Sequence, residues 1–170
     1  SNHFRQERIV GFKVDEITKA PYRENGISVD LKEPFYSSEL YTDKIIQYIE
    51  KHRKDNKFKN NPFFAYAAYS APHWPLQAPD YYIKKYEDNY HAGYRAIKSG
   101  RLENMKKMGL IKEDLNPEES NLWPKWSQLD ENTKQEEAKK MAVYAAMVEA
   151  LDFHIGRLVN FLDKSELLNK

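Results

Sequence analysis

The 170-residue sequence contains no cysteine. This absence excludes disulfides, thiolate metal ligands and a cysteine nucleophile within the chain, and it leaves cysteine usage silent about the cellular compartment. Long hydrophobic runs are also lacking, because the longest, Phe63 to Tyr69, is far too short to span a bilayer. The first residues carry no secretory signal pattern.

An excess of charge of either sign is lacking too. The chain has 27 Lys and Arg against 26 Asp and Glu, for a net charge of +1. This balance gives no support for nucleic acid or an anionic membrane as a partner. Hydrophobic residues make up 41% and charged residues 31%, which is typical of a soluble globular domain with its own core. A small acidic substrate stays compatible with this composition.

Helical periodicity is clearest near the C-terminus. It predicts one long helix over about 130–163, starting near Asp130. We expect its apolar stripe to pack on a sheet, the alternative being a coiled-coil seam. The stripe consists of seven residues: Met141, Tyr144, Val148, Leu151, Ile155, Leu158 and Leu162.

Three further helices are predicted upstream. The first begins near Ser37 or Ser38, either of which is a favourable cap. A short helix follows over 80–86, and a very polar one over 92–108 is closed by Gly109.

The N-terminal region has little helical signal. Residues 9–14 and 27–31 are short alternating stretches that indicate loops or edge strands, with a turn at Asn25-Gly26.

A continuous apolar run, residues 62–69, separates the first two helices. Such a run between turn residues predicts a strand buried on both faces, as in a parallel sheet. Its alanines make a helix the competing interpretation, but the aromatic residues and the short length favour the strand.

The loop that follows, residues 70–79, contains three prolines and His73. Ligands bind beyond the carboxyl ends of strands in open α/β sheets, so we expect chemistry here. A rigid loop holds an imidazole in one place, and the ordinary pKa of a histidine lies near neutrality. The remaining histidines form no metal signature, and we expect structural or solvent-facing roles for them: His3, His52, His91 and His154, the last at the edge of the stripe.

Several motifs carry a family resemblance. Residues 61–66 (NPFFAY), followed by residues 71–79 (APHWPLQAP), resemble the central motif of bacterial arylsulfatases. Residues 141–149 (MAVYAAMVE) with Ile155-Gly156-Arg157 resemble the helix that precedes the second metal-binding strand of that family. Weaker likenesses lie at 35–38, at 41–44 and at 88–111, and the order of all these motifs agrees along nearly the whole chain.

For the fold, the resemblance implies the α/β class of the alkaline phosphatase superfamily. The chain would be part of a doubly wound sheet, mostly helical, with one buried strand at about 62–69 and the long helix at about 130–163. Residues 1–170 would then be a single internal segment of a sulfatase catalytic domain.

For function, the resemblance implies an enzyme that hydrolyses sulfate monoesters to sulfate and an alcohol or phenol. His73 matches the histidine that contacts the sulfate side of the substrate and assists departure of the alcohol. A proton or hydrogen-bond donor at that place stabilises charge that develops only in the transition state. Trp74 is a second substrate-binding candidate, although its ring would equally suit a wedge between the loop and the scaffold.

The rest of the family's machinery does not match this sequence. Formylglycine is made from a Cys/Ser-x-Pro-x-Arg motif, and in Ser70-Ala71-Pro72-His73-Trp74 a tryptophan replaces the arginine. The paired aspartates, the later Asp-Asn pair and the downstream lysine are missing. The resemblance therefore implies that calcium and formylglycine belong to a longer parent protein, with no metal ligand here, and that this segment alone is inactive.

Two alternatives stay open at this stage. One is a phosphoester or phosphonate hydrolase on the same scaffold. The other is a non-enzymatic helical interaction module, which predicts no strand at 62–69 and a last helix that self-associates. For a sulfatase segment we expect an exposed, unpaired strand edge and dimerisation through it. The family resemblance implies a periplasmic or secreted location.

Overall fold

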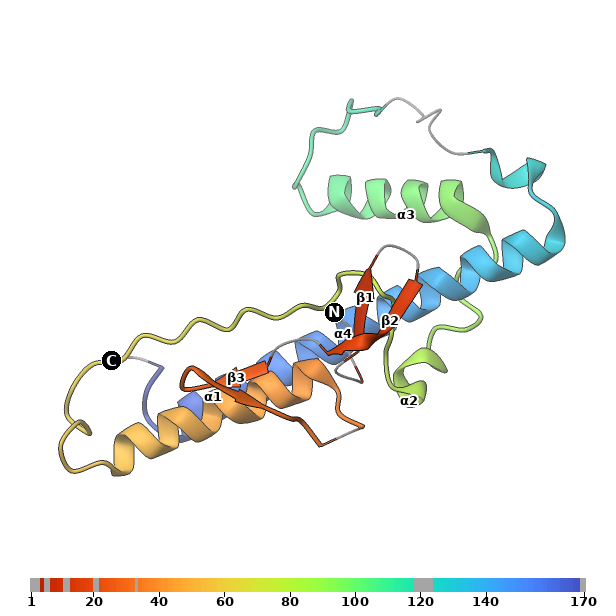
Figure 1. The fold of residues 1–170 in the computed structure, drawn as a ribbon. Helices are drawn as coiled ribbons and strands as arrows, with labels where there is room; N and C mark the ends of the chain where they lie inside the picture. Colours follow the sequence, from red (N-terminus) through yellow and green to blue (C-terminus); the bar gives the residue numbers. More distant parts are fainter. Residues whose placement is uncertain are drawn as a thin grey trace.

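The computed structural model describes residues 4, 7–10, 13–19, 22–32, 34–117 and 124–168. Helices dominate: α1 (Ser37–Lys54), α2 (Asp80–Ile83), α3 (Gly93–Lys107), the 3₁₀ turn η1 (Trp126–Gln128) and α4 (Glu131–Lys164). Figure 1 shows α4 as the longest element, with α1 beside its C-terminal half and α3 near its N-terminal end. The predicted long helix is confirmed, and so are the helices at 37, 80 and 92–108.

Two small antiparallel hairpins precede α1. Strand β1 (Glu7–Val10) pairs with β2 (Lys13–Lys19), and β3 (Tyr22–Glu24) pairs with β4 (Ile27–Val29). The second hairpin turns at Asn25 and Gly26, whose φ angles of 52° and 81° are the left-handed values that a two-residue hairpin turn requires. The predicted turn is therefore confirmed, and the short N-terminal stretches lie in or overlap these hairpins.

The two helices of the main body start differently. Asp130 caps α4, because its side chain accepts a hydrogen bond from the Thr133 amide at 2.9 Å. The predicted serine cap of α1 is wrong. Tyr36 is the capping residue and makes no side-chain cap, while Ser37 and Ser38 lie buried in the first turn. The chain enters the helix one residue early because the Tyr36 ring is buried in the core against Phe4 and His154.

The core lies where α1 and α2 pack on α4. The buried face of α4 consists of small residues and two larger ones: Ala138, Ala142, Ala146, Met147, Ala150 and His154. The predicted stripe of seven apolar residues is buried only in part, with Met141, Leu151, Leu158 and Leu162 half-buried and Leu151 packed against the core. Tyr144, Val148 and Ile155 are each at least 40% exposed. Alanines allow the helix backbones to approach closely, so small side chains dominate the interface and these three large stripe residues lie outside it.

The predicted buried strand at 62–69 is also wrong. No strand occurs within this stretch, all of which the structure describes. The chain instead runs back past α1 in extended form, as the yellow segment of Figure 1 shows. Phe64 is 92% and Tyr66 81% exposed. A strand needs a hydrogen-bonding neighbour, and the described strands pair only within the two hairpins, which leaves this segment without a sheet.

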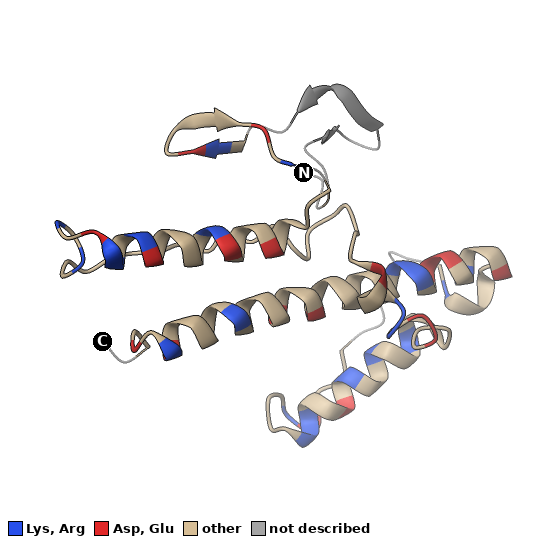
Figure 2. Ribbon diagram, turned by 90° about the horizontal axis from the view of Figure 1, so that it is seen from below, with Lys and Arg blue, Asp and Glu red and all other residues tan. Residues whose placement is uncertain are grey.

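Charge is spread evenly over the main body. Figure 2 shows acidic and basic residues interspersed along α1 and α4, whereas α3 is mainly basic. Described ion pairs tie the elements together, among them Lys44 with Glu24 at 2.9 Å and Arg157 with Asp43 at 2.6 Å. No helix in the described ranges is both long and apolar enough to cross a membrane.

Candidate functional site

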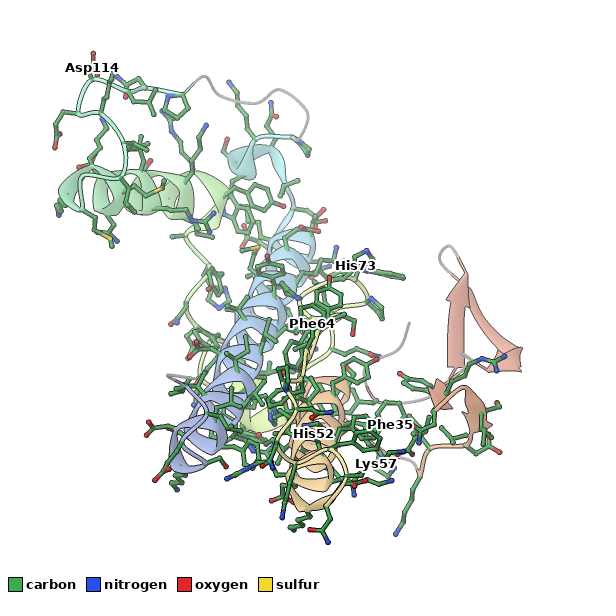
Figure 3. All side chains as sticks on the ribbon, turned by 90° about the vertical axis from the view of Figure 1, so that its left-hand side faces the viewer. Phe35, His52, Lys57, Phe64, His73 and Asp114 are labelled. Atoms are coloured by element: carbon green, nitrogen blue, oxygen red, sulfur yellow. The ribbon has the colours of Figure 1, made fainter. Side chains whose placement is uncertain are left out.

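The loop between the extended segment and α2 alternates between buried and exposed residues. Ala71, Pro75 and Ala78 are buried, whereas His73 and Trp74 are exposed. Figure 3 shows His73 at the outer edge of the side chains gathered around α1 and α4. Buried residues on both sides therefore hold the loop against the core and present the imidazole at the surface.

A polar contact anchors the start of this loop to α1. The Thr42 hydroxyl is buried and donates to the Ser38 carbonyl oxygen at 2.9 Å. It also lies 2.6 Å from the Tyr69 hydroxyl. Because the single Thr42 proton is already used, the Tyr69 hydroxyl is the donor in the second contact.

A second contact anchors the end of the loop to α4. The Gln77 amide donates to the thioether sulfur of Met147 at 3.3 Å, across 70 residues of sequence. Met147 is fully buried in a cluster with Ala71, Ala78 and Tyr82. Lys85 and Glu149 form a further ion pair between the chain after α2 and α4, and the hydrogen bond from Lys85 lowers the pKa of Glu149.

The hydrogen bonds of His73 define its tautomer. Its Nδ1 lies 2.6 Å from the Trp74 carbonyl oxygen, and its amide donates to the Ser70 carbonyl oxygen at 2.9 Å. A carbonyl oxygen only accepts, so Nδ1 carries a proton. Nε2 is then the ring nitrogen that takes no part in this contact.

Trp74 shares the exposed side of the loop with His73. The residue is 48% exposed, so about half of its surface is covered by the rest of the protein. Ala71, Pro75 and Ala78 are the buried residues of the loop. Both roles considered for Trp74 from the sequence, contact with a substrate and packing of the loop against the scaffold, stay predictions.

A hollow elsewhere in the molecule is separate from the loop. It lies between the β3–β4 turn and α1 and is lined by charged and polar residues, among them Glu24, Lys44, Tyr48 and Lys51. Neither His73 nor Trp74 lines it.

The described residues do not form a metal centre. In those ranges no group of three or more His, Asp or Glu side chains is arranged to hold an ion. The sequence also lacks cysteine. The residues present therefore do not fit the calcium site or the formylglycine that the sequence resemblance implies, and we derive no chemical step through either.

Comparison with known proteins identifies the family. The sulfatase family model matches residues 4–170. The chain belongs to the sulfatase family. The fold class is therefore that of the sulfatase domain, which is alkaline-phosphatase-like, and the expected family membership is confirmed. The lack of a strand at 62–69 agrees with the interaction-module hypothesis, but the family match outweighs it.

Individual relatives agree with the family match. An uncharacterized sulfatase of Schizosaccharomyces pombe is 39% identical over 145 residues, which is 83% of this chain and 25% of that protein. The arylsulfatase of Klebsiella aerogenes is 36% identical over 152 residues, 86% of this chain and 32% of that protein. Mouse arylsulfatase J is 34% identical over 65 residues, 38% of this chain and 10% of that protein. The chain thus spans about a quarter to a third of its two longer-matching relatives.

The structure distinguishes the histidines from one another. His73 is exposed in its anchored loop, His91 is exposed beside Asp88, and His52 makes a hydrogen bond to the Asn61 carbonyl oxygen at 3.0 Å. His154 is buried rather than at the edge of an exposed stripe, and His3 lies outside the described residues. Sequence reasoning missed the anchors Thr42, Tyr69 and Met147. Thr42 and Met147 stood in motifs and Tyr69 in the predicted strand, but no sequence pattern pairs them with the loop, because their contacts span 27 and 70 residues.

Proposed function

We propose that this chain is the central segment of the catalytic domain of an arylsulfatase, an enzyme that hydrolyses sulfate monoesters to sulfate and an alcohol or phenol. The family match over residues 4–170 and the similarity to the Klebsiella arylsulfatase support this reading. The observation that carries it is the exposed His73, held by buried residues on both sides within the motif that resembles the arylsulfatase histidine loop.

His73 acts on the leaving group in this proposal. Its Nδ1–H is committed to the Trp74 carbonyl oxygen, so a protonated Nε2 is the donor directed at the departing oxygen. A leaving alkoxide or phenoxide gains negative charge in the transition state, and a donor there lowers the barrier more than it strengthens ground-state binding. The exposed Trp74 ring lies beside it and contacts the organic part of the ester.

The remaining parts of the site come from outside this chain. The nucleophile, a formylglycine, and the calcium ligands belong to other parts of a longer protein, and the segment alone has no activity. In this proposal the longer protein acts in the periplasm or outside the cell. The substrate is a small sulfate ester.

The test is hydrolysis of an aryl sulfate by the full-length protein, compared with its His73→Ala variant and with this segment alone. We expect the full-length protein to hydrolyse the ester and this segment alone to be inactive. The His73→Ala variant should be slower by roughly a hundredfold or more, as is typical when a general acid is lost. His91→Ala is the matched control, because His91 is also exposed but lies outside the anchored loop.

Three other outcomes would each contradict a different part of this proposal. Activity of the parent on phosphate or phosphonate esters instead of sulfate esters would overturn the substrate class and keep the scaffold. Equal losses in the His73 and His91 variants would remove His73 from catalysis. Inactivity on all these esters would favour the interaction module.

A further inference from the structure

The two polar anchors of the histidine loop lie symmetrically about His73. Tyr69 precedes it by four residues and bonds to Thr42 on α1, and Gln77 follows it by four residues and bonds to Met147 on α4. Both receiving side chains are fully buried. The loop is therefore attached at each end to a different helix of the core.

Neither anchor is needed to form the elements that it joins. Helix α1 is closed by its own backbone bonds, and the Thr42 hydroxyl bonds to Ser38 within it. Helix α4 has its cap at Asp130, and its buried face holds four alanines and His154 besides Met147. Removing the Tyr69 hydroxyl or the sulfur atom alone thus changes the attachment of the loop more than the packing of the helices.

Position matters greatly for a proton donor. A displacement of about 1 Å in a reacting group lowers rates by as much as a hundredfold, because the aligned geometry is lost. His73 lies midway between the anchors, and its own ring bond is to the neighbouring Trp74 within the same loop. Any shift of the loop therefore moves the ring and its hydrogen-bond partner together.

We propose that Tyr69 and Met147 are positioning residues for His73, holding the loop so that the imidazole meets the leaving-group oxygen of a sulfate ester. This inference rests on the proposed function. It adds a specific role for two residues that do not touch the substrate, one acting through the Thr42 hydroxyl of α1 and the other through the Gln77 amide.

The test uses near-isosteric variants in the full-length protein. Tyr69→Phe removes only the hydroxyl, and Met147→Leu removes the sulfur while it keeps the buried volume. Tyr94→Phe is the matched control for the first, since the Tyr94 hydroxyl donates to Glu137 away from the loop. Met141→Leu is the control for the second, on the same helix and half-buried.

The decisive readout is the dependence on the leaving group. Two aryl sulfates are compared, one releasing a strongly acidic phenol and the other a weakly acidic phenol. A weakly acidic phenol is a poor leaving group and depends more on a proton donor. Each loop variant should therefore lose about tenfold in kcat on the ester of the weakly acidic phenol, and about twofold or less on the ester of the strongly acidic phenol. Loss of folded protein would instead lower the rates on both esters equally. When His73 is already replaced by alanine, the loop substitutions should cause no further difference between the two esters.

A structural readout separates this inference from the proposed function. In histidine-labelled full-length protein, the ring resonances of His73 should shift in both loop variants and stay unchanged in both controls. Unchanged resonances, or equal losses on the two esters, would overturn the positioning role. Shifted resonances in a protein without sulfatase activity would refute the proposed function and uphold the attachment of the loop.

Discussion

At the scale of the residue, His154 is a titratable side chain in the core. It is buried on α4, and its Nδ1 lies 3.1 Å from an Arg157 nitrogen. Arginine only donates, so Nδ1 accepts and the ring is neutral. Burial, followed by the charge of Arg157, lowers the pKa of His154, and the carboxylates of Glu39 and Asp43 on α1 offset this only partly. The imidazole is thus a neutral acceptor within the α1–α4 contact.

This arrangement predicts a specific pH dependence of stability. Because the folded-state pKa of His154 lies below that of the unfolded chain, the unfolded state binds more protons as the pH falls below about 6.5. The contribution of the neutral His154 ring to the free energy of unfolding should therefore be complete above that pH and should decrease toward pH 5. Urea unfolding at pH 7.5 and 5.5 measures this decrease. In His154→Gln the free energy of unfolding should fall less between these two pH values than in the unchanged protein. His91→Gln, at an exposed site, should leave the fall unchanged. The same fall in both variants would contradict the assignment to His154.

At the scale of the element, the start of α3 packs closely against η1 and α4. Gly93 has a φ of +83°, and a Cβ there would lie 2.4 Å from atoms of the Trp126 ring in η1. Tyr94 stacks edge-on against the same ring at 4.9 Å and donates to Glu137 of α4 at 3.0 Å. Burial and then that bond raise the pKa of Tyr94 to about 12. The start of α3 is therefore defined by packing on the Trp126 ring.

Substituting Gly93 tests this attachment. Gly93→Ala should lower the free energy of unfolding by about 1–3 kcal/mol, because the residue keeps a left-handed conformation and collides with Trp126. Gly100, within the same helix, has open space around it, so Gly100→Ala should instead stabilise by roughly 1 kcal/mol. Urea unfolding of both variants gives the comparison. Destabilisation by Gly100→Ala as large as that by Gly93→Ala would show that the ring contact is not the cause.

At the scale of the whole molecule, large apolar side chains lie outside the core on several elements. Among them are the extended segment with Phe63, Phe64 and Tyr66, the outer face of α4 with Tyr144 and Val148, and the end of α3 with Met108 and Leu110. An unpaired extended segment with exposed aromatic residues favours association with another strand. The exposed strand edge that the sequence led us to expect is absent, because residues 62–69 form no strand, but apolar side chains of this segment are exposed.

Self-association of the chain is the expected consequence. Sedimentation velocity at increasing concentration should reveal dimers or larger species, and the double change Phe64→Ser and Tyr66→Ser should shift the protein toward monomer. Leu110→Ser, which removes a 64% exposed leucine near the end of α3, is the control and should have little effect. A wild-type chain that stays monomeric throughout would contradict this prediction.

Local chemistry was sufficient for the sequence to define the helices. The helix start near Asp130, the helical periodicity that follows it and Gly109 after α3 act within a few residues, and the helices that they predicted are present. The hairpin turn at Asn25 and Gly26 is equally local. The histidine loop was recognisable for the same reason, since its prolines and its motif are continuous in sequence.

Only the tertiary structure decided what each element faces. Pairing of the 62–69 segment depends on a strand distant in sequence, and no amount of local β-propensity supplies that partner. The buried face of α4 depends on how closely α1 approaches, which favours alanine over the larger stripe residues that periodicity selected. The anchors of His73 span 27 and 70 residues, so their geometry exists only in the folded chain.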